Sequence, residues 1–109
     1  MNKLNTVSIP GSILQEMIDG IQDQANEGNE DMATLFSKIE AAPAKTVGRG
    51  WAVTVDLNWD EFYALKGEVD YKNEYWNTGA FGMSGGTDPA IAGAAKRLFN
   101  RMSKMEVSG

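Results

Sequence analysis

The stretch from Ala52 to Trp76 constrains the fold more than any other, because it changes from a strand pattern to a helix pattern within a few residues. At its start Val53, Val55 and Leu57 alternate with polar residues, and a period of two is typical of a half-buried strand. Beyond position 58 the apolar residues recur at helical spacing instead. A strand that runs directly into a long helix is therefore the central unit of the predicted fold.

The predicted helix begins with a capping signal and has two different faces. Asn58 is a favourable N-cap residue, and Glu61 can reach back to its backbone amide, as in a capping box. One face carries an apolar stripe that should enter the core, formed by Phe62, Leu65, Val69 and Trp76. Tyr71 and Tyr75, four residues apart, point to nearly the opposite side. We therefore expect a core face and a second, aromatic face on the same helix.

The residues before this unit predict a strand and two helices. A strand is expected over about 3–9, because apolar and polar residues alternate there. A helix should follow to about position 25, with Ser12 as its cap or, slightly earlier, with Pro10 as its first residue. A second helix is expected over about 31–42, where apolar residues follow the i, i+3, i+4, i+7 pattern.

Glycine and proline mark the remaining elements. Gly48-Arg49-Gly50 is typical of a hairpin turn, so a further strand is expected over about 45–47. The glycine-rich segment 77–89 predicts a mobile surface loop. Asp88 followed by Pro89 is a strong helix start. We expect this last helix to end near Met105 and the residues after it to fray.

The order of these elements repeats itself within a single domain of residues 1–109. A strand, a helix and a second helix are predicted within 4–42 and again within 51–105. Three pairs share one sequence offset, and a fourth match has a larger one: Val7 with Val55, Ile9 with Leu57, Met17 with Leu65, and Leu35-Phe36 with Leu98-Phe99. The predicted fold class is α+β, with a small two- or three-stranded antiparallel sheet covered by about four helices. So narrow a sheet has open edges, and we expect a homodimer to cover them.

Composition excludes several classes of chemistry. The chain has no cysteine and no histidine, which removes disulfides, thiolate catalysis and the commonest general base and metal ligand. Catalysis would have to rest on Asp60, Glu61, Glu68 or Asp70, and nothing in their spacing requires it. We therefore predict no enzyme, no cofactor and no metal. The chain lacks an apolar run long enough for a membrane span or a secretory signal, so a cytoplasmic protein is expected.

The net charge of −5 is unevenly distributed. Asp19, Asp23 and Glu27 follow one face of the first predicted helix, within an acidic run that does not match an EF-hand loop. They form either a solvated face or a surface that mimics phosphates or docks on a basic protein groove. A basic cluster lies on the last helix, at Lys96, Arg97, Arg101 and Lys104. It can serve the fold, by complementing the helix dipole or pairing with the acidic helix, or bind an acidic partner. Direct nucleic-acid binding is not expected, because the basic cluster is short.

Aromatic residues outside the core stripe are the main candidates for a binding site. Tyr71 and Tyr75 are the sharpest, because large, partly solvated aromatic side chains are the usual anchors of protein interfaces. Trp51, Trp59 and Tyr63 also lie off the stripe. Phe81 and Met83 are the apolar residues of the glycine-rich segment, which we consider a candidate partner-binding loop. The alternative is that this segment or a neighbouring helix covers the aromatic residues.

The sequence thus favours a small, acidic, non-catalytic protein that binds another protein and acts as an inhibitor or adaptor. A virus or mobile element could encode such a protein against a host system. One alternative is a structural homo-oligomer whose aromatic face makes only self-contacts. Another is a small-ligand-binding protein in which the glycine-rich segment closes over a pocket lined by Trp59 and Tyr63.

Overall fold

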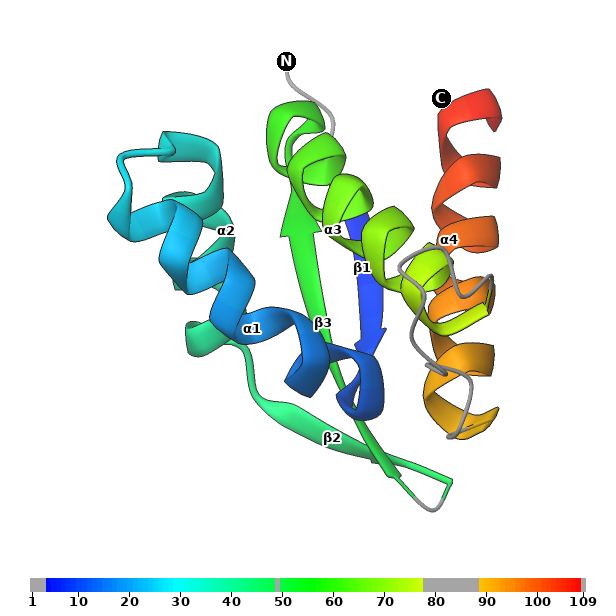
Figure 1. The fold of residues 1–109 in the computed structure, drawn as a ribbon. Helices are drawn as coiled ribbons and strands as arrows, with labels where there is room; N and C mark the ends of the chain where they lie inside the picture. Colours follow the sequence, from blue (N-terminus) through cyan, green and yellow to red (C-terminus); the bar gives the residue numbers. More distant parts are fainter. Residues whose placement is uncertain (1–3, 49, 78–88, 109) are drawn as a thin grey trace.

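The computed structural model describes residues 4–48, 50–77 and 89–108, without the side chains of residues 76, 77, 107 and 108. Three strands and four helices follow one another along the chain (Figure 1): β1 (Asn5–Pro10), α1 (Gly11–Asn26), α2 (Glu30–Ala41), β2 (Ala44–Val47), β3 (Gly50–Leu57), α3 (Trp59–Asn77) and α4 (Pro89–Ser108). The sheet is antiparallel throughout. The prediction of an α+β fold with a small antiparallel sheet and four helices is therefore confirmed.

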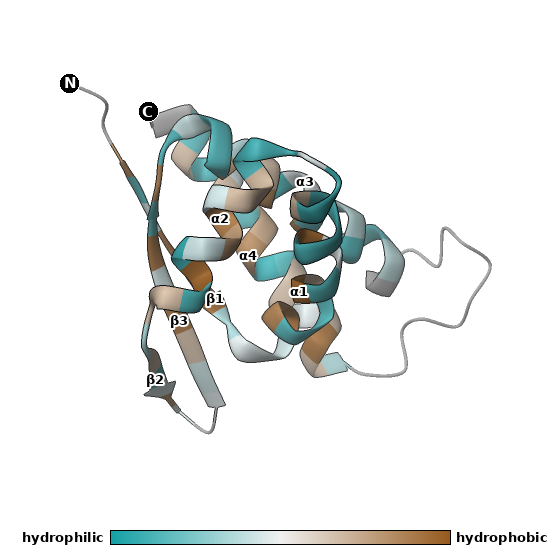
Figure 2. Cartoon of the chain, turned by 90° about the vertical axis from the view of Figure 1, so that its left-hand side faces the viewer, coloured by the Kyte–Doolittle hydropathy of each residue, from teal (hydrophilic) through white to brown (hydrophobic). Residues whose placement is uncertain are grey.

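The sheet has the order β1-β3-β2, with the two strands of the alternating pattern paired along six residues. The helices lie on one side of it (Figure 2). Val7 of β1 and Val55 of β3 face the helices and are buried, whereas Thr6 and Asp56 point to the other side and are exposed. There the Thr6 hydroxyl donates a 2.6 Å hydrogen bond to an Asp56 carboxylate oxygen. The alternation of apolar and polar residues thus sets which face of the sheet is covered.

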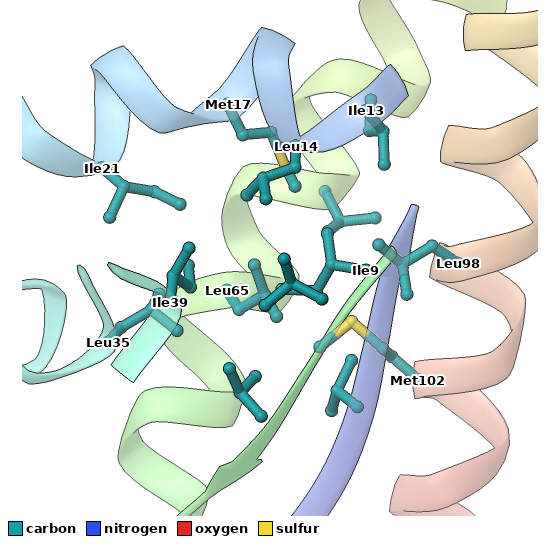
Figure 3. Close-up of a cluster of buried hydrophobic side chains, with 14 of the residues drawn as sticks. Ile9, Ile13, Leu14, Met17, Ile21, Leu35, Ile39, Leu65, Leu98 and Met102 are labelled. Atoms are coloured by element: carbon teal, nitrogen blue, oxygen red, sulfur yellow. The ribbon is translucent and has the colours of Figure 1, made fainter. Parts of the chain in front are cut away.

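The core lies between the sheet and the inner faces of all four helices (Figure 3). Ile9 from β1 meets Leu65 from α3 and Leu98 and Met102 from α4, and Met17 points inward from α1. All five side chains are almost completely buried. The combined burial of side chains from β1, β3 and the four helices explains how a chain of this size holds one layer of helices against so narrow a sheet.

The start of α1 differs from both predictions, since Pro10 is the last residue of β1 and not the first residue of the helix. Ser12 does not cap this helix, because α1 begins at Gly11 directly after β1, and its N-cap, Pro10, makes no side-chain cap hydrogen bond. Gly11 is fixed by packing, since a Cβ atom there would lie 2.3 Å from the ring of Trp51. The strand therefore passes into the helix without a connecting residue, and Ser12 already lies in the first turn.

Two other helix ends also shift. Asn29 caps α2, its side-chain oxygen accepting a 3.1 Å hydrogen bond from the Met32 amide, so α2 begins one residue before the predicted start. The expectation that the chain frays after Met105 is wrong, because α4 continues to Ser108. The Glu106 carboxylate pairs with the Lys66 ammonium group of α3. A contact with another helix thus stabilises the end of α4.

Several contacts of β1, α1 and α2 have counterparts among β3, α3 and α4. Two antiparallel strands have a local two-fold axis, and Val7 pairs with Val55, its counterpart 48 positions later. Gly20 and Glu68 have the same offset and meet where α1 crosses α3, with a Cβ on Gly20 lying 3.4 Å from a Glu68 carboxylate oxygen. The duplication of 4–42 in 51–105 remains a prediction, since similar arrangement alone does not establish common origin.

The second helices of the two units make equivalent contacts. The Lys38 ammonium group of α2 donates a 2.9 Å hydrogen bond to the carbonyl of Asp56 in β3. The Arg101 guanidinium of α4, the counterpart of Lys38 in the sequence alignment of the two units, donates a 3.1 Å hydrogen bond to the carbonyl of Ser8 in β1. Each second helix therefore holds the edge of the other unit's strand.

Candidate functional site

The inner face of α3 and its first turn have the predicted structure. Phe62, Leu65 and Val69 are completely buried, whereas the side chain of Trp76, the fourth residue of the predicted stripe, lies outside the described part of the protein. At the N-terminus the Asn58 side-chain oxygen accepts a 2.8 Å hydrogen bond from the Glu61 amide, and a Glu61 carboxylate oxygen accepts a 2.9 Å bond from the Asn58 amide. The capping box is confirmed, and it fixes the direction in which α3 leaves the sheet.

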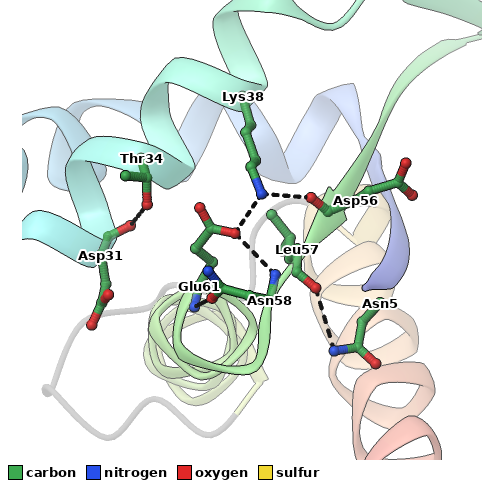
Figure 4. A network of polar contacts seen from close by, with 8 residues as sticks. All are labelled: Asn5, Asp31, Thr34, Lys38, Asp56, Leu57, Asn58 and Glu61. Atoms are coloured by element: carbon green, nitrogen blue, oxygen red, sulfur yellow. Dashed lines mark hydrogen bonds and ion pairs between the residues drawn. The ribbon is translucent and has the colours of Figure 1, made fainter. Parts of the chain in front are cut away.

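Glu61 also forms an ion pair that joins α2 to α3 (Figure 4). Its carboxylate lies 2.6 Å from the Lys38 ammonium group; the Glu61 side chain is 2% exposed, whereas that of Lys38 is 37% exposed. Burial raises the pKa of Glu61, but hydrogen bonds from Lys38 and the Asn58 amide lower it more, so the net shift of the pKa is downward. The nearby Thr34 hydroxyl donates to the Asp31 carbonyl, so Lys38 and Asn58 are the partners that hold the charge.

The outer face of α3 carries a row of four positions spaced four residues apart, of which three are aromatic and one is a glycine. We call Trp59, Tyr63, Gly67 and Tyr71 the α3 outer row. Tyr63 is 51% exposed and Tyr71 is 50% exposed. The rings of Trp59 and Tyr63 stack, with centroids 5.7 Å apart and planes 29° from parallel. Trp59 also makes an edge-to-face contact with the buried Phe62 ring, with the ring centroids 5.1 Å apart, so the row is anchored to the core at one end.

Gly67 separates the two exposed tyrosines of the row. Among the described residues, a Cβ atom at this position would find no atom within 4 Å, so packing in this part of the chain does not require glycine there. Beside it is a shallow hollow of about 200 Å³ on the seam between α3 and α4, lined by Tyr63, Lys66, Gly67, Asp70 and Phe99. Sequence reasoning missed Gly67, although its position four residues from each tyrosine is visible in the sequence.

The other predicted aromatic residues occupy different surroundings. Tyr75 is only partly exposed, and the Lys72 ammonium group lies 5.6 Å from the Tyr71 ring centroid and 5.7 Å from that of Tyr75. Trp51 is 37% exposed and lies against Gly11, away from α3. Phe81 and Met83 lie outside the described residues.

The acidic candidates do not join the α3 outer row. Asp19, Asp23 and Glu27 are exposed on α1 and in the turn after it. In Figure 1 this turn and the α3–α4 seam lie at opposite sides of the molecule. Over residues 4–48, 50–77 and 89–108, no three acidic side chains come together in a way that could hold a metal ion.

The four carboxylates considered for catalysis do not converge either. Glu61 is engaged by Lys38 of α2, and Glu68 accepts a hydrogen bond from the Gln24 side chain of α1. Asp60 is exposed in the first turn of α3, and Asp70 lines the hollow beside Gly67. These positions share a helix but serve different contacts.

No protein-family model, curated protein or solved structure matches the chain. In the described part of the chain, no helix has the length and apolar character needed to cross a membrane. The function must therefore be inferred from the side chains and their surroundings.

Proposed function

We propose that the protein is a non-catalytic protein-binding module whose main docking surface is the α3 outer row. One observation carries the proposal: α3 is completely buried along Phe62, Leu65 and Val69, yet its other side exposes half of Tyr63 and half of Tyr71. Tyrosine contributes a large apolar area and a polar tip, and it is enriched among the residues that dominate binding energy in protein interfaces.

The geometry of the row favours a partner with a protruding side chain. Tyr63 is held by its stack on Trp59, so it loses little conformational freedom when a partner binds. Gly67 leaves a gap between Tyr63 and Tyr71 into which such a side chain can fit. A glycine within a helix costs about 1 kcal/mol relative to alanine, and the fold of this chain gains no contact in return. A role in binding therefore explains the glycine at position 67 better than a role in folding does.

A binder of this kind acts by occupying a surface of another protein, which is the mode of an inhibitor or an adaptor. We propose that mode here, and its use by a virus or mobile element against a host system remains a prediction. The small-ligand alternative has less support, because the hollow at Tyr63 has about 200 Å³, below the roughly 300 Å³ at which small-molecule sites begin. Trp59 stacks on Tyr63 and does not line that hollow.

Affinity capture from a lysate of the source organism, followed by quantitative mass spectrometry, tests the proposal. The wild-type protein is compared with the Tyr63→Ala/Tyr71→Ala variant and with Leu4→Ala, a control that removes an equally exposed apolar side chain from the start of the sheet. We expect a protein that wild type and Leu4→Ala recover equally and the tyrosine variant loses. Unchanged recovery by a folded tyrosine variant would place the interface elsewhere.

Light scattering separates this function from that of a structural subunit. A large homo-oligomer that dissociates when Tyr63 and Tyr71 are replaced would favour the structural alternative, because the row would then make only self-contacts. We expect the two replacements to leave the oligomeric state unchanged.

A further inference from the structure

A second surface lies on α4, beside the edge of β1. Arg97, Arg101 and Lys104 are exposed at positions i, i+4 and i+7, which is one face of the helix. Within the described part of the chain none of the three forms an ion pair, so the pairing with the acidic helix considered from the sequence is not observed. The charges of this face are therefore available to another molecule.

Two adjoining hollows make this face concave. One has about 510 Å³ and runs from Ser8 and Pro10 past Ser12 and Gln15 to Trp51. The other has about 440 Å³ and is lined by Pro10, Arg97, Asn100, Arg101 and Lys104. Arg101 and Pro10 border both, so the hollows meet at Arg101. We call this surface the α4 groove. Of the described residues that line it, none is acidic.

A comparison of Lys38 with Arg101 shows what differs at Arg101. The carboxylate of Glu61 in α3 neutralises Lys38 of α2, which holds the edge of β3. The counterpart of Glu61, 48 positions earlier, is the buried apolar residue Ile13. Arg101 therefore occupies the place of Lys38 at the edge of β1, but the described part of the chain supplies no carboxylate for it.

We propose that the α4 groove binds an acidic segment of a partner protein, whose carboxylates contact Arg101 and its neighbours on α4. A guanidinium presents several donors in a plane, and Arg101 uses one nitrogen for the Ser8 carbonyl, which leaves others for a carboxylate. The Glu61–Lys38 pair is the precedent for a carboxylate as the matching group. This proposal does not depend on the α3 outer row.

The size and lining of the groove favour a chain segment over a single ion. Each hollow exceeds the space that one carboxylate fills. Trp51 and the 61% exposed Val47 border the larger hollow and can contact apolar side chains that flank the acidic ones. The acidic α1–α2 turn of the same molecule lies across the fold from α4 (Figure 1), so it cannot fill the groove.

Fluorescence anisotropy with a rhodamine-labelled hexaglutamate peptide tests this proposal. We expect binding that weakens with added salt and falls roughly tenfold or more in Arg97→Gln/Arg101→Gln, as the loss of charge-assisted hydrogen bonds predicts. Lys96→Gln is the matched control: Lys96 is also exposed on α4 but does not line the groove. It should bind as wild type does, and Arg101→Lys should retain most of the affinity. Circular dichroism establishes that each variant is folded.

Three results would overturn the proposal. A loss of binding free energy in Lys96→Gln at least half as large as that in Arg97→Gln/Arg101→Gln would mean that the peptide responds only to overall charge, because Lys96→Gln removes one charge and the double variant removes two. Displacement of the peptide by inorganic phosphate at lower concentrations than by glutarate would show that the groove prefers phosphate. Self-association at low salt that Arg97→Gln/Arg101→Gln abolishes would assign the groove to a second copy of this chain. Failure of the α3 proposal is distinguishable, because Tyr63→Ala/Tyr71→Ala should still bind hexaglutamate.

Discussion

Glu61 is the only buried charged side chain among the residues that the structure describes. Burial opposes its ionisation, and the bonds from Lys38 and the Asn58 amide more than offset that cost, so its pKa in the folded protein lies below the ordinary value of 4.5. One carboxylate thus satisfies a helix cap and a cation from another helix. The junction of α2, β3 and α3 depends on its charge.

The lowered pKa of Glu61 predicts acid sensitivity. The ionised carboxylate contributes stability above pH 4.5, and this contribution is lost as the pH falls through the lower pKa of the folded state. In Glu61→Gln the free energy of unfolding should be lower at neutral pH and should change less with pH below 4.5. Urea unfolding of both proteins over a pH series measures this. An equal loss of unfolding free energy in the wild type and in Glu61→Gln as the pH falls below 4.5 would contradict this prediction.

Gly67→Ala should stabilise the fold and weaken partner binding. The new methyl group meets no atom, and alanine is favoured over glycine in a helix by about 0.5–1 kcal/mol. It also narrows the gap between Tyr63 and Tyr71. Gly11→Ala is a control that should destabilise the fold, because its Cβ would overlap the ring of Trp51. Urea midpoints and recovery of the captured partner are the readouts. A stabilised Gly67→Ala with unchanged capture would remove the role given to this residue.

At the scale of elements, α2 and α4 hold the strands through two different cations. Lys38→Met should cost about 1–3 kcal/mol of unfolding free energy, because it removes the cation from the buried Glu61 carboxylate and leaves it only the Asn58 amide. Arg101→Met removes one hydrogen bond at an exposed site and should cost about 1 kcal/mol or less. Chemical denaturation of the two variants compares them. An equal loss of unfolding free energy in the two variants would mean that Lys38 does not stabilise the Glu61 carboxylate.

The elements themselves could be predicted from local patterns. Alternation gave the strands β1 and β3, helical spacing gave the core face of α3, and Asn58 with Glu61 gave its start. Apart from the start of α2, which its own cap Asn29 sets, the errors lie where a distant residue decides. Trp51 packs on the first residue of α1, and Lys66 pairs with Glu106 near the end of α4. Neither contact has a local signal.

The candidate sites could be predicted only in part for the same reason. Periodicity predicted that Tyr71 and Tyr75 lie away from the core, but it did not predict that Tyr71 is more exposed than Tyr75. The basic cluster was visible as a cluster, yet its lack of ion pairs depends on which elements surround α4. Gly67 matters only once the space around it is known. Exposure and partner identity arise from packing.

At the scale of the whole molecule, three surfaces of different chemistry lie on different elements. Acidic residues cover the outside of α1 and its following turn, the α3 outer row is aromatic, and the α4 groove is basic. An acidic side chain of the same chain does not neutralise Arg97, Arg101 or Lys104 in the described part of the protein. A partner that contacts more than one of these surfaces would recognise their arrangement as well as their chemistry.

The homodimer remains a prediction, and β2 is the element that favours it. All four residues of β2 are exposed, and its outer edge pairs with no other strand in the described residues. Such an edge can pair with the same strand of a second copy. Light scattering should then give twice the chain mass of 11.9 kDa, and Val47→Lys should reduce it to one chain. A single-chain mass for the wild type would exclude the dimer.

The central claim is that α3 uses one face for the core and the other for a partner, and footprinting of the captured complex tests it most directly. Hydroxyl-radical labelling, read by mass spectrometry, compares the isolated protein with the complex recovered from the source organism. Tyr63 and Tyr71 should be labelled readily in the isolated protein and protected in the complex, while Leu4, which is equally exposed, stays equally labelled in both. Equal labelling of the two tyrosines in both samples would contradict the claim.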